Sequence, residues 1–157
     1  MIARVRIGLI SDTHGLLRPE AAALLSGVDH IVHAGDIGAA SVLTRLRQIA
    51  PVTAVRGNND KGPWAQSLAV SEVLQVSERR IYVLHDIAEL ALDPAASGFA
   101  VVVSGHSHKP SVVTRMGTLF VNPGSAGPRR FKLPVTAGIL NIMGETLQAR
   151  IHELRFD

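Results

Sequence analysis

The first third of the chain alternates strand and helix patterns, and this alternation restricts the fold more than any other feature of the sequence. Runs of apolar and β-branched residues predict strands at 4–11, 30–34 and 52–56, and helical spacing predicts helices at 18–25 and 40–50. Strand–helix–strand–helix–strand at this spacing implies that the strands pair in parallel, with right-handed crossovers. We therefore predict an α/β fold with a partly parallel sheet.

The rest of the chain predicts antiparallel hairpins around one further buried strand. Val101–Val103 is a continuous apolar run, which is typical of a strand buried on both faces. A short helix is expected between residues 87 and 97, followed later by a glycine- and proline-rich loop at 122–134. Because there is no linker or repeat, residues 1–157 are expected to form a single domain. The hairpins are expected at 72–85, turning near 78–79, at 111–122, turning at 116–117, and at 136–154, turning at 143–144.

The composition excludes several classes of protein. Hydrophobic residues make up 46% of the 157 residues and charged residues 18%, which fits a compact domain and not a disordered chain. The absence of cysteine excludes disulfides and thiolate metal sites. The net charge is only +3 and there is no long run of Lys and Arg, so no stable nucleic-acid partner is predicted.

The N-terminal residues enter a strand pattern directly, without the apolar region and cleavage site of a signal peptide. No apolar stretch approaches the length needed to cross a bilayer. We therefore expect a cytoplasmic protein without a membrane partner.

Polar side chains follow the predicted strands at the point where each strand ends. In open α/β sheets, the loops at the carboxyl ends of the strands converge on one crevice, where ligands bind. Side chains from five separate segments can therefore meet there. They are Asp12 and His14, Asp36, the run Asn58, Asn59 and Asp60, then His85, and last His106 and His108.

Seven of these residues are candidate metal ligands, namely two aspartates, four histidines and one asparagine. Their oxygen and nitrogen atoms suit Mn²⁺, Fe, Zn²⁺ or Ni²⁺. Seven ligands exceed the needs of one ion and fit two ions that share a bridging carboxylate. Because two divalent cations outweigh the charge of two aspartates, such a site attracts an anion, and phosphate is the leading candidate.

His106 and His108 lie in the stretch "GHSH", directly after the predicted Val101–Val103 strand. In locally extended backbone, positions i and i+2 point the same way, so both imidazoles are expected to face one spot. Gly105 is expected to allow a backbone turn that other residues resist. Taken alone, the motif also fits two exposed loop histidines.

Five short motifs occur in order along nearly the whole chain: "DTH" at 12–14, "GD" at 35–36, "GNND" at 57–60, a lone His85, and "GHSH" at 105–108. With these motifs the sequence resembles the calcineurin-like metallophosphoesterases, in particular their small bacterial and archaeal phosphodiesterase branch. The resemblance implies two facing mixed β-sheets flanked by helices, with a two-metal site at the strand ends. It also implies that the "NPGS" loop at 122–125 supports the site, and it allows a homodimer or homotetramer.

The resemblance divides the seven candidate ligands into two sets of three that are joined by one bridging carboxylate. The expected cofactor is a pair of divalent ions, with Mn²⁺ preferred and Ni²⁺, Fe or Zn²⁺ as alternatives. The first set is Asp12, His14 and His108, the second is Asn58, His85 and His106, and the bridge is Asp36.

The implied reaction is hydrolysis of a small phosphate ester by direct attack of a hydroxide that bridges the two metals. Many relatives that act on phosphomonoesters carry, at the position of Asn59, a histidine that protonates the leaving group. The amide of Asn59 donates a hydrogen bond but is not a general acid, so we predict phosphodiesters or activated esters as substrates. The candidate catalytic residues are Asp36, Asn59, Asp60 and Arg56, the last of which would offset charge on the phosphoryl oxygens.

Two residues near the motifs have open roles. Asp86 follows His85 where relatives usually have glycine, and it either changes the loop or hydrogen-bonds a ligand. His33 is either a partner of a metal ligand or a packed core histidine.

The main alternative function is a catalytically silent metal-binding or protein-interaction scaffold on the same fold, as in the retromer subunit that resembles these phosphoesterases. Such scaffolds tend to lose ligands, whereas this chain retains all seven candidates. A metallo-β-lactamase type of hydrolase is disfavoured because its H-x-H-x-D-H motif follows an early strand. This chain begins with D-x-H and places H-x-H late.

Overall fold

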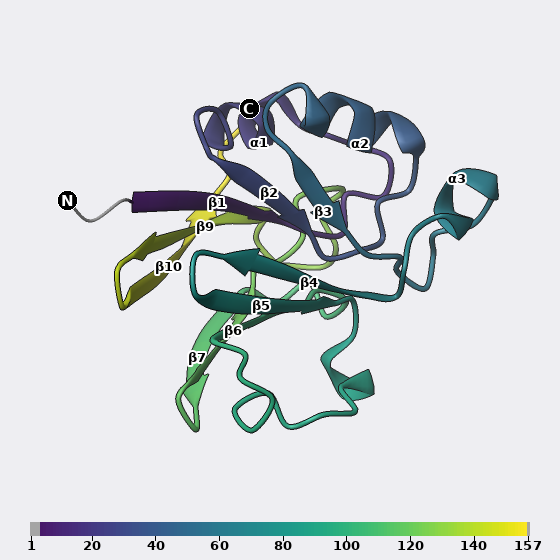
Figure 1. Cartoon of the computed structure of the whole chain (residues 1–157). Coiled ribbons are helices and arrows are strands. Elements are labelled where there is room, and N and C mark those ends of the chain that lie inside the picture. Colours follow the sequence, from purple (N-terminus) through teal and green to yellow (C-terminus); the bar gives the residue numbers. More distant parts are fainter. Residues whose placement is uncertain (1–3, 157) are drawn as a thin grey trace.

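The structure, a computed structural model that describes residues 4–156, consists of two five-stranded β-sheets that lie face to face (Figure 1). This arrangement confirms the predicted pair of facing mixed sheets. The first sheet has the strand order β10 (Thr146–Glu153), β9 (Thr136–Met143), β1 (Arg4–Ile10), β2 (His30–His33) and β3 (Val52–Ala54). The second has the order β4 (Ser71–Val76), β5 (Arg79–Leu84), β6 (Val101–Val103), β8 (Thr118–Asn122) and β7 (Ser111–Arg115).

Two helices, α1 (Pro19–Leu24) and α2 (Ala40–Arg47), cover the outer face of the first sheet (Figure 1). Along α2, the buried side chains Val42, Leu43 and Leu46 have the spacing that places them on one face of the helix. In residues 4–156, none of the helices has the length and apolar character that crossing a membrane requires.

The parallel pairing predicted for the first three strands is confirmed. β1 runs parallel to β2, with Gly8 opposite Ile31, and β2 runs parallel to β3, with Val32 opposite Thr53. On its other side β1 pairs with β9 in antiparallel fashion. The carboxyl ends of β1, β2 and β3 therefore lie at the same edge of the sheet.

The buried strand predicted at Val101–Val103 is also confirmed. This strand, β6, is fully buried and runs parallel to both of its neighbours, β5 and β8. The backbone N–H of Gly105, just after β6, donates to the carbonyl oxygen of His85, just after β5, at 2.9 Å. The ends of these two strands are thus held together.

Several element boundaries differ from the predictions. The turn of helix α3 (Pro63–Gln66) was not predicted, and the helix expected between residues 87 and 97 is a single 3₁₀ turn, η1 (Ile87–Glu89). The hairpin turn at 116–117 lies where it was predicted, but the other two turns lie one residue away, at 77–78 and 144–145. At these turns Ser77 and Gly144 adopt left-handed backbone, with φ of 53° and 59°.

The core has two layers, one between α1, α2 and the first sheet, and one between the two sheets. Along β1 the side chains alternate, so Ile7 and Leu9 pack between the sheets while Ile10 packs toward the helices. Because β1 is covered on both faces, the residues that directly follow it, Ser11 and Asp12, are fully buried.

Candidate metal centre

The carboxyl ends of two strands from each sheet meet at one point of the molecule. The backbone N–H of Asp12 donates to the carbonyl oxygen of Gly35 at 3.0 Å, which joins the ends of β1 and β2. The backbone N–H of His106 donates to Asp12 Oδ2 at 3.1 Å, which joins the two sheets. The candidate ligands brought to this point are Asp12 and His14 after β1, Asp36 after β2, His85 after β5, and His106 and His108 after β6.

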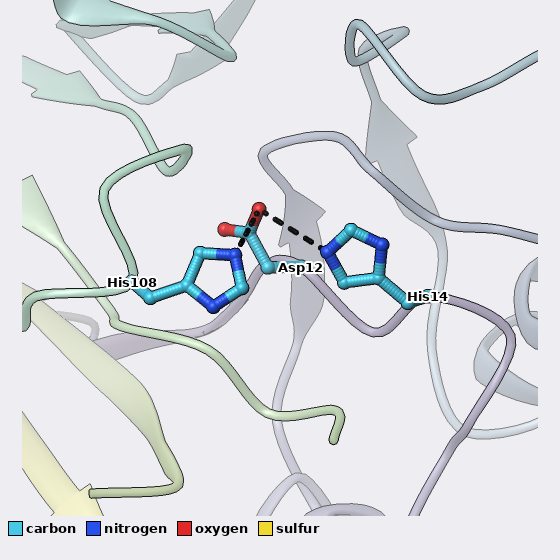
Figure 2. Close-up of side chains that lie close together, drawn as sticks. All are labelled: Asp12, His14 and His108. Carbon is cyan, nitrogen blue, oxygen red and sulfur yellow. Dashed lines mark ion pairs between the residues drawn. The ribbon is translucent and has the colours of Figure 1, made fainter. Parts of the chain in front are cut away.

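Asp12 lies at the centre of the site, and its two carboxylate oxygens have different surroundings. Oδ2 accepts hydrogen bonds from Ser11 Oγ at 2.8 Å and from the His106 backbone at 3.1 Å. Oδ1 lies 3.4 Å from Nε2 of His108 and 3.9 Å from Nε2 of both His14 and His85. Figure 2 shows Asp12 between His14 and His108. One oxygen is therefore anchored, and the other points at three imidazoles.

Asp36 supplies a second carboxylate to the same space. Its Oδ2 lies 3.3 Å from Nε2 of His85 and 3.8 Å from Nε2 of His14, so it faces one histidine from each of the two predicted ligand sets. Two overlapping groups of side chains are spaced closely enough to hold a cation, and both contain Asp12. They are Asp12, His14 and His108, and Asp12, Asp36 and His85.

The hydrogen bonding of these residues fits a bound cation. Among the described residues, Asp12 Oδ1, His14 Nε2 and His108 Nδ1 are buried atoms without a hydrogen-bond partner. A buried polar atom left unpaired costs about 1–3 kcal/mol. A divalent cation bound between Asp12 Oδ1 and His14 Nε2 would satisfy two of these atoms at once. The donor set contains oxygen and nitrogen and no sulfur, which suits Mn²⁺, Fe, Zn²⁺ and Ni²⁺.

Five of the candidate ligands have left-handed backbone conformations. Their φ angles are positive, a region that costs a non-glycine residue of order 1 kcal/mol. The extended conformation expected for His106 and His108 is therefore wrong, and the two rings contact different candidate ligands, His85 and Asp12. The angles are 55° at Asp12, 48° at His14, 54° at Asp36, 69° at His106 and 63° at His108.

Position 105 requires glycine because there is no space there for a side chain, and not because the backbone makes an unusual turn. Its φ is not in the left-handed region, in contrast to the expectation from sequence. A Cβ atom at this position would collide with Ser11 Oγ and lie 2.7 Å from Asp12 Oδ2. The glycine therefore lets the strand end of the second sheet approach the anchored oxygen of Asp12.

Replacing Gly105 by alanine is expected to weaken Mn²⁺ binding at least about tenfold, because the added methyl group displaces Ser11 and Asp12. Titration calorimetry on the metal-stripped protein measures this. Gly138→Ala is the matched control, since a Cβ there meets no atom closer than 3.4 Å. Equal Mn²⁺ affinity in the two variants would contradict the assigned role of Gly105.

The two carboxylates differ in their tendency to ionise. Burial raises the pKa of Asp12, and the charge of Asp36 adds to this effect, although Ser11 and the histidines oppose it. Burial also acts to raise the pKa of Asp36, but hydrogen bonds from His85 and Asn59 outweigh it and hold that pKa well below its usual range. Burial acts to lower the pKa of His85, but Asp36 and the Ala34 carbonyl outweigh it, so the pKa is raised. A metal at His85 therefore competes with a proton that these contacts stabilise on the ring.

The loop after β3 supports Asp36 and borders a cavity. The backbone N–H of Asn59 donates to Asp36 Oδ1 at 2.9 Å, and its side-chain amide donates to Asp36 Oδ2 at 3.0 Å. Asp60 accepts backbone N–H bonds from Gly38 and Gly57, both at 2.9 Å, and so holds the loop. A cavity of about 330 Å³ lies beside this loop, and Arg56, Asn58, Lys61, His85, Asp86 and His106 help to line it.

Sequence reasoning left the role of His33 open, and the structure places it in a buried network behind the ligands. The backbone N–H of Gly35 donates to His33 Nδ1 at 3.1 Å, so the ring hydrogen lies on Nε2, which is 3.0 Å from Thr13 Oγ1. The hydroxyl of Thr13 in turn donates to the carbonyl oxygen of Ile37 at 2.8 Å. The network ties the loop after β1 to the loop after β2.

The "NPGS" loop also touches the site from behind. Asn122 Nδ2 donates to the carbonyl oxygen of Gly105 at 2.9 Å, and Ser125 Oγ donates to the carbonyl oxygen of Asp12 at 3.1 Å.

The hydrogen bond from Ser11 Oγ to Asp12 Oδ2 was not predicted from sequence. The position of Ser11 directly before an aspartate ligand is the signal that could have identified it.

Comparison with known proteins agrees with the fold and identifies a family. The calcineurin-like phosphoesterase superfamily domain matches residues 5–145. A probable metallophosphoesterase of Methanothermobacter thermautotrophicus is 33% identical, across 92% of this chain and 90% of the relative. Two solved structures share the fold. Vacuolar protein sorting 29 of Cryptosporidium parvum has a TM-score of 0.83 at 22% identity, covering 97% of this chain and 92% of its own. An archaeal phosphodiesterase has a TM-score of 0.80 at 23% identity, covering 96% of this chain and 100% of its own.

The matched segment spans all of β1 except its first residue, every strand from β2 to β9, and all six candidate ligands that meet at the strand ends. Its extent, together with the archaeal relative, shows that the chain belongs to the calcineurin-like phosphoesterase superfamily.

Proposed function

We propose that this protein is a phosphodiesterase that uses two divalent cations, with Mn²⁺ as the preferred metal. The observation that carries the proposal is the environment of Asp12 Oδ1. This buried carboxylate oxygen has no hydrogen-bond partner among the described residues, yet three imidazole nitrogens lie within 3.9 Å of it. Such an arrangement is costly without a cation and favourable with one.

The seven candidate ligands keep the roles that the resemblance implies. When bound, the two cations would lower the pKa of a water molecule and offset the charge of the phosphoryl oxygens. In this proposal Asp12, His14 and His108, which lie close enough together to hold a cation, would bind the first ion. The second ion would be bound by Asn58, His85 and His106, and Asp36, which faces His14 and His85, would bind both.

The chain's own residues would prepare the site for an anionic ester. Asn59 donates two hydrogen bonds to Asp36 and keeps it ionised and oriented. His85 donates from Nδ1 to the Ala34 carbonyl at 2.7 Å, which turns its Nε2 toward the carboxylates. Arg56 and Lys61 line the adjoining cavity and would attract the phosphate ester electrostatically.

The preference for diesters follows from the position of Asn59. This residue bonds both oxygens of Asp36 through groups that do not release a proton near neutral pH. The leaving group must therefore depart without a proton from position 59, which favours activated esters and diesters over alkyl monoesters. The fold shared with an archaeal phosphodiesterase supports the same choice.

A matrix of metals and substrates tests this proposal. We expect metal-stripped protein to be inactive and Mn²⁺ to restore hydrolysis of an aryl phosphodiester. Its kcat/KM should exceed that for an alkyl phosphomonoester at least about tenfold. Asn59→His, which supplies an acid, should narrow that difference. A metal-loaded protein that turns over no phosphate ester would instead support the protein-interaction scaffold, whose fold is represented by vacuolar protein sorting 29.

A further inference from the structure

Asp86 lies beside His106, on the side of the ring that faces away from the other candidate ligands. His106 Nδ1 is 3.3 Å from His85 Nε2, at the inner side of the site. The other ring nitrogen, Nε2, is 3.7 Å from Asp86 Oδ2. His106 is thus placed between one candidate ligand and one carboxylate.

The carboxylate of Asp86 is itself held in place. Its Oδ1 accepts the backbone N–H of Ala88 at 3.0 Å and caps the 3₁₀ turn η1. One oxygen is therefore used by the backbone, and Oδ2 remains for His106. The side chain of His106 is 46% exposed and that of Asp86 is 29% exposed, so the ring has room for the small movement that brings the two atoms to hydrogen-bond distance.

The two nitrogens of the His106 ring face different partners. Asp86 Oδ2 is an acceptor only, so it pairs with His106 Nε2 when that nitrogen carries the ring hydrogen. Nδ1 lies on the inner side of the ring, 3.3 Å from the candidate ligand atom His85 Nε2. A ring hydrogen held on Nε2 by Asp86 therefore leaves the Nδ1 lone pair for a metal.

We propose that Asp86 is a positioning residue that accepts a hydrogen bond from His106 Nε2 and so presents the Nδ1 lone pair of His106 to the metal centre. The inference rests on the proposed function in that it requires a metal at this site. A carboxylate in this position fixes the ring orientation of a histidine ligand and its tautomer. The resemblance places glycine here in most relatives, so Asp86 would be a specific feature of this chain.

Two variants of Asp86 separate its contact with His106 from its cap on η1. Asp86→Ser keeps a side-chain oxygen that can cap Ala88 but is too short to reach His106. Asp86→Asn keeps both acceptor positions and removes only the charge. Glu89→Gln is the charge control, because Glu89 lines the same cavity but lies within 4.0 Å of no histidine in the described part of the chain.

Titration calorimetry with Mn²⁺ on the metal-stripped proteins is the first measurement. We expect Asp86→Ser to bind Mn²⁺ about 10- to 100-fold more weakly than the native chain. Asp86→Asn should show a smaller loss of Mn²⁺ affinity than Asp86→Ser. Glu89→Gln should stay within about threefold, as expected for an exposed charge. The proposal is overturned if Asp86→Ser binds Mn²⁺ as tightly as the native chain does, or if Glu89→Gln loses as much Mn²⁺ affinity as Asp86→Ser.

The ¹⁵N chemical shifts of the His106 ring in metal-free protein are the second measurement. The native chain should show mainly the tautomer with hydrogen on Nε2, and Asp86→Ser should show a mixture of tautomers. An unchanged tautomer in Asp86→Ser would overturn the proposal. Because this readout needs neither metal nor substrate, it judges Asp86 even if the native chain binds no Mn²⁺, a result that would defeat the proposed function instead.

Discussion

Replacing Asp36 by asparagine is expected to lower kcat/KM for an aryl phosphodiester about a thousandfold, or about 4 kcal/mol at the transition state, and to remove most of the bound metal. The carboxylate lies between the Nε2 atoms of His14 and His85, at 3.8 and 3.3 Å, and thus faces both predicted ligand sets. The amide of asparagine has nearly the same shape but lacks the negative charge that two cations would share. Both metal positions should therefore lose affinity together.

The measurement combines metal content by mass spectrometry with steady-state kinetics. Asp93→Asn is the matched control, since the Asp93 carboxylate is exposed and its only side-chain hydrogen bond in the described residues is to the Ala96 backbone, at 3.3 Å. The backbone N–H of Asn59 can still donate to the new amide oxygen, so the loop after β3 should stay in place. Full metal content and native turnover in Asp36→Asn would show that Asp36 does not bridge the ions.

The convergence of the candidate ligands could be predicted from sequence because it depends on strand direction alone. Asp12 and Asp36 lie in the loops that begin at the ends of β1 and β2, and the parallel pairing of these strands brings the two carboxylates to one edge. The "GHSH" motif follows β6, whose continuous apolar run predicted a buried strand. Hydrophobic patterning and the rule for strand ends therefore suffice to gather these side chains.

The backbone conformation at the ligands could not be predicted, because it is imposed by contacts between distant segments. His14 has a φ of 48°, and its backbone N–H is bonded to the carbonyl oxygen of Asp36 at 2.9 Å. His106 has a φ of 69°, and its backbone N–H is bonded to Asp12 Oδ2 across 94 positions of sequence. Local preferences oppose both conformations, and only the assembled sheets supply the bonds that maintain them.

The bonds from Asn59 to Asp36 were missed for a related reason. The motif identified Asn59 as the residue in place of a general acid, but its direction depends on the turn at 57–60. That turn is closed by the backbone N–H of Asp60 donating to Gly57 at 3.1 Å and by Asp60 Oδ2 accepting from Gly57 at 2.9 Å. The sequence identifies the chemical group at position 59. The conformation of the turn at 57–60 determines which atoms that group contacts.

His33 is expected to make the metal-free protein sensitive to acid between pH 6.5 and about 3. Burial, together with the charge of His85, lowers the pKa of His33 from 6.5 to about 3 in the folded protein. The ring is fully buried and holds Gly35 and Thr13 through its two nitrogens, so it has no room for a second ring hydrogen on Nδ1. In the unfolded chain the same ring binds a proton near pH 6.5.

The direction in which the free energy of unfolding changes with pH follows from the difference in bound protons between the unfolded and the folded chain. Above pH 6.5 His33 is neutral in both states, so its contribution to stability is fully present there. As the pH falls below 6.5, the unfolded chain binds one proton more than the folded chain, and the free energy of unfolding falls by about 1.4 kcal/mol per pH unit. At pH 5 this loss amounts to about 2 kcal/mol, and it continues until the pH approaches the folded pKa of about 3.

Denaturant unfolding of the native chain and of His33→Gln, in chelator and between pH 8 and 4, tests this expectation. Glutamine can still donate to Thr13 but does not titrate, so the difference in unfolding free energy between the two proteins should shrink as the pH falls. Taking the difference cancels the other titrating groups, among them Asp12, Asp36 and His85. If the variant does not fold, NMR titration of the native His33 ring decides instead, because the ring should stay neutral down to pH 4. A pH-independent difference between the two proteins, or a ring that titrates near pH 6.5, would show that the buried network does not exclude the proton.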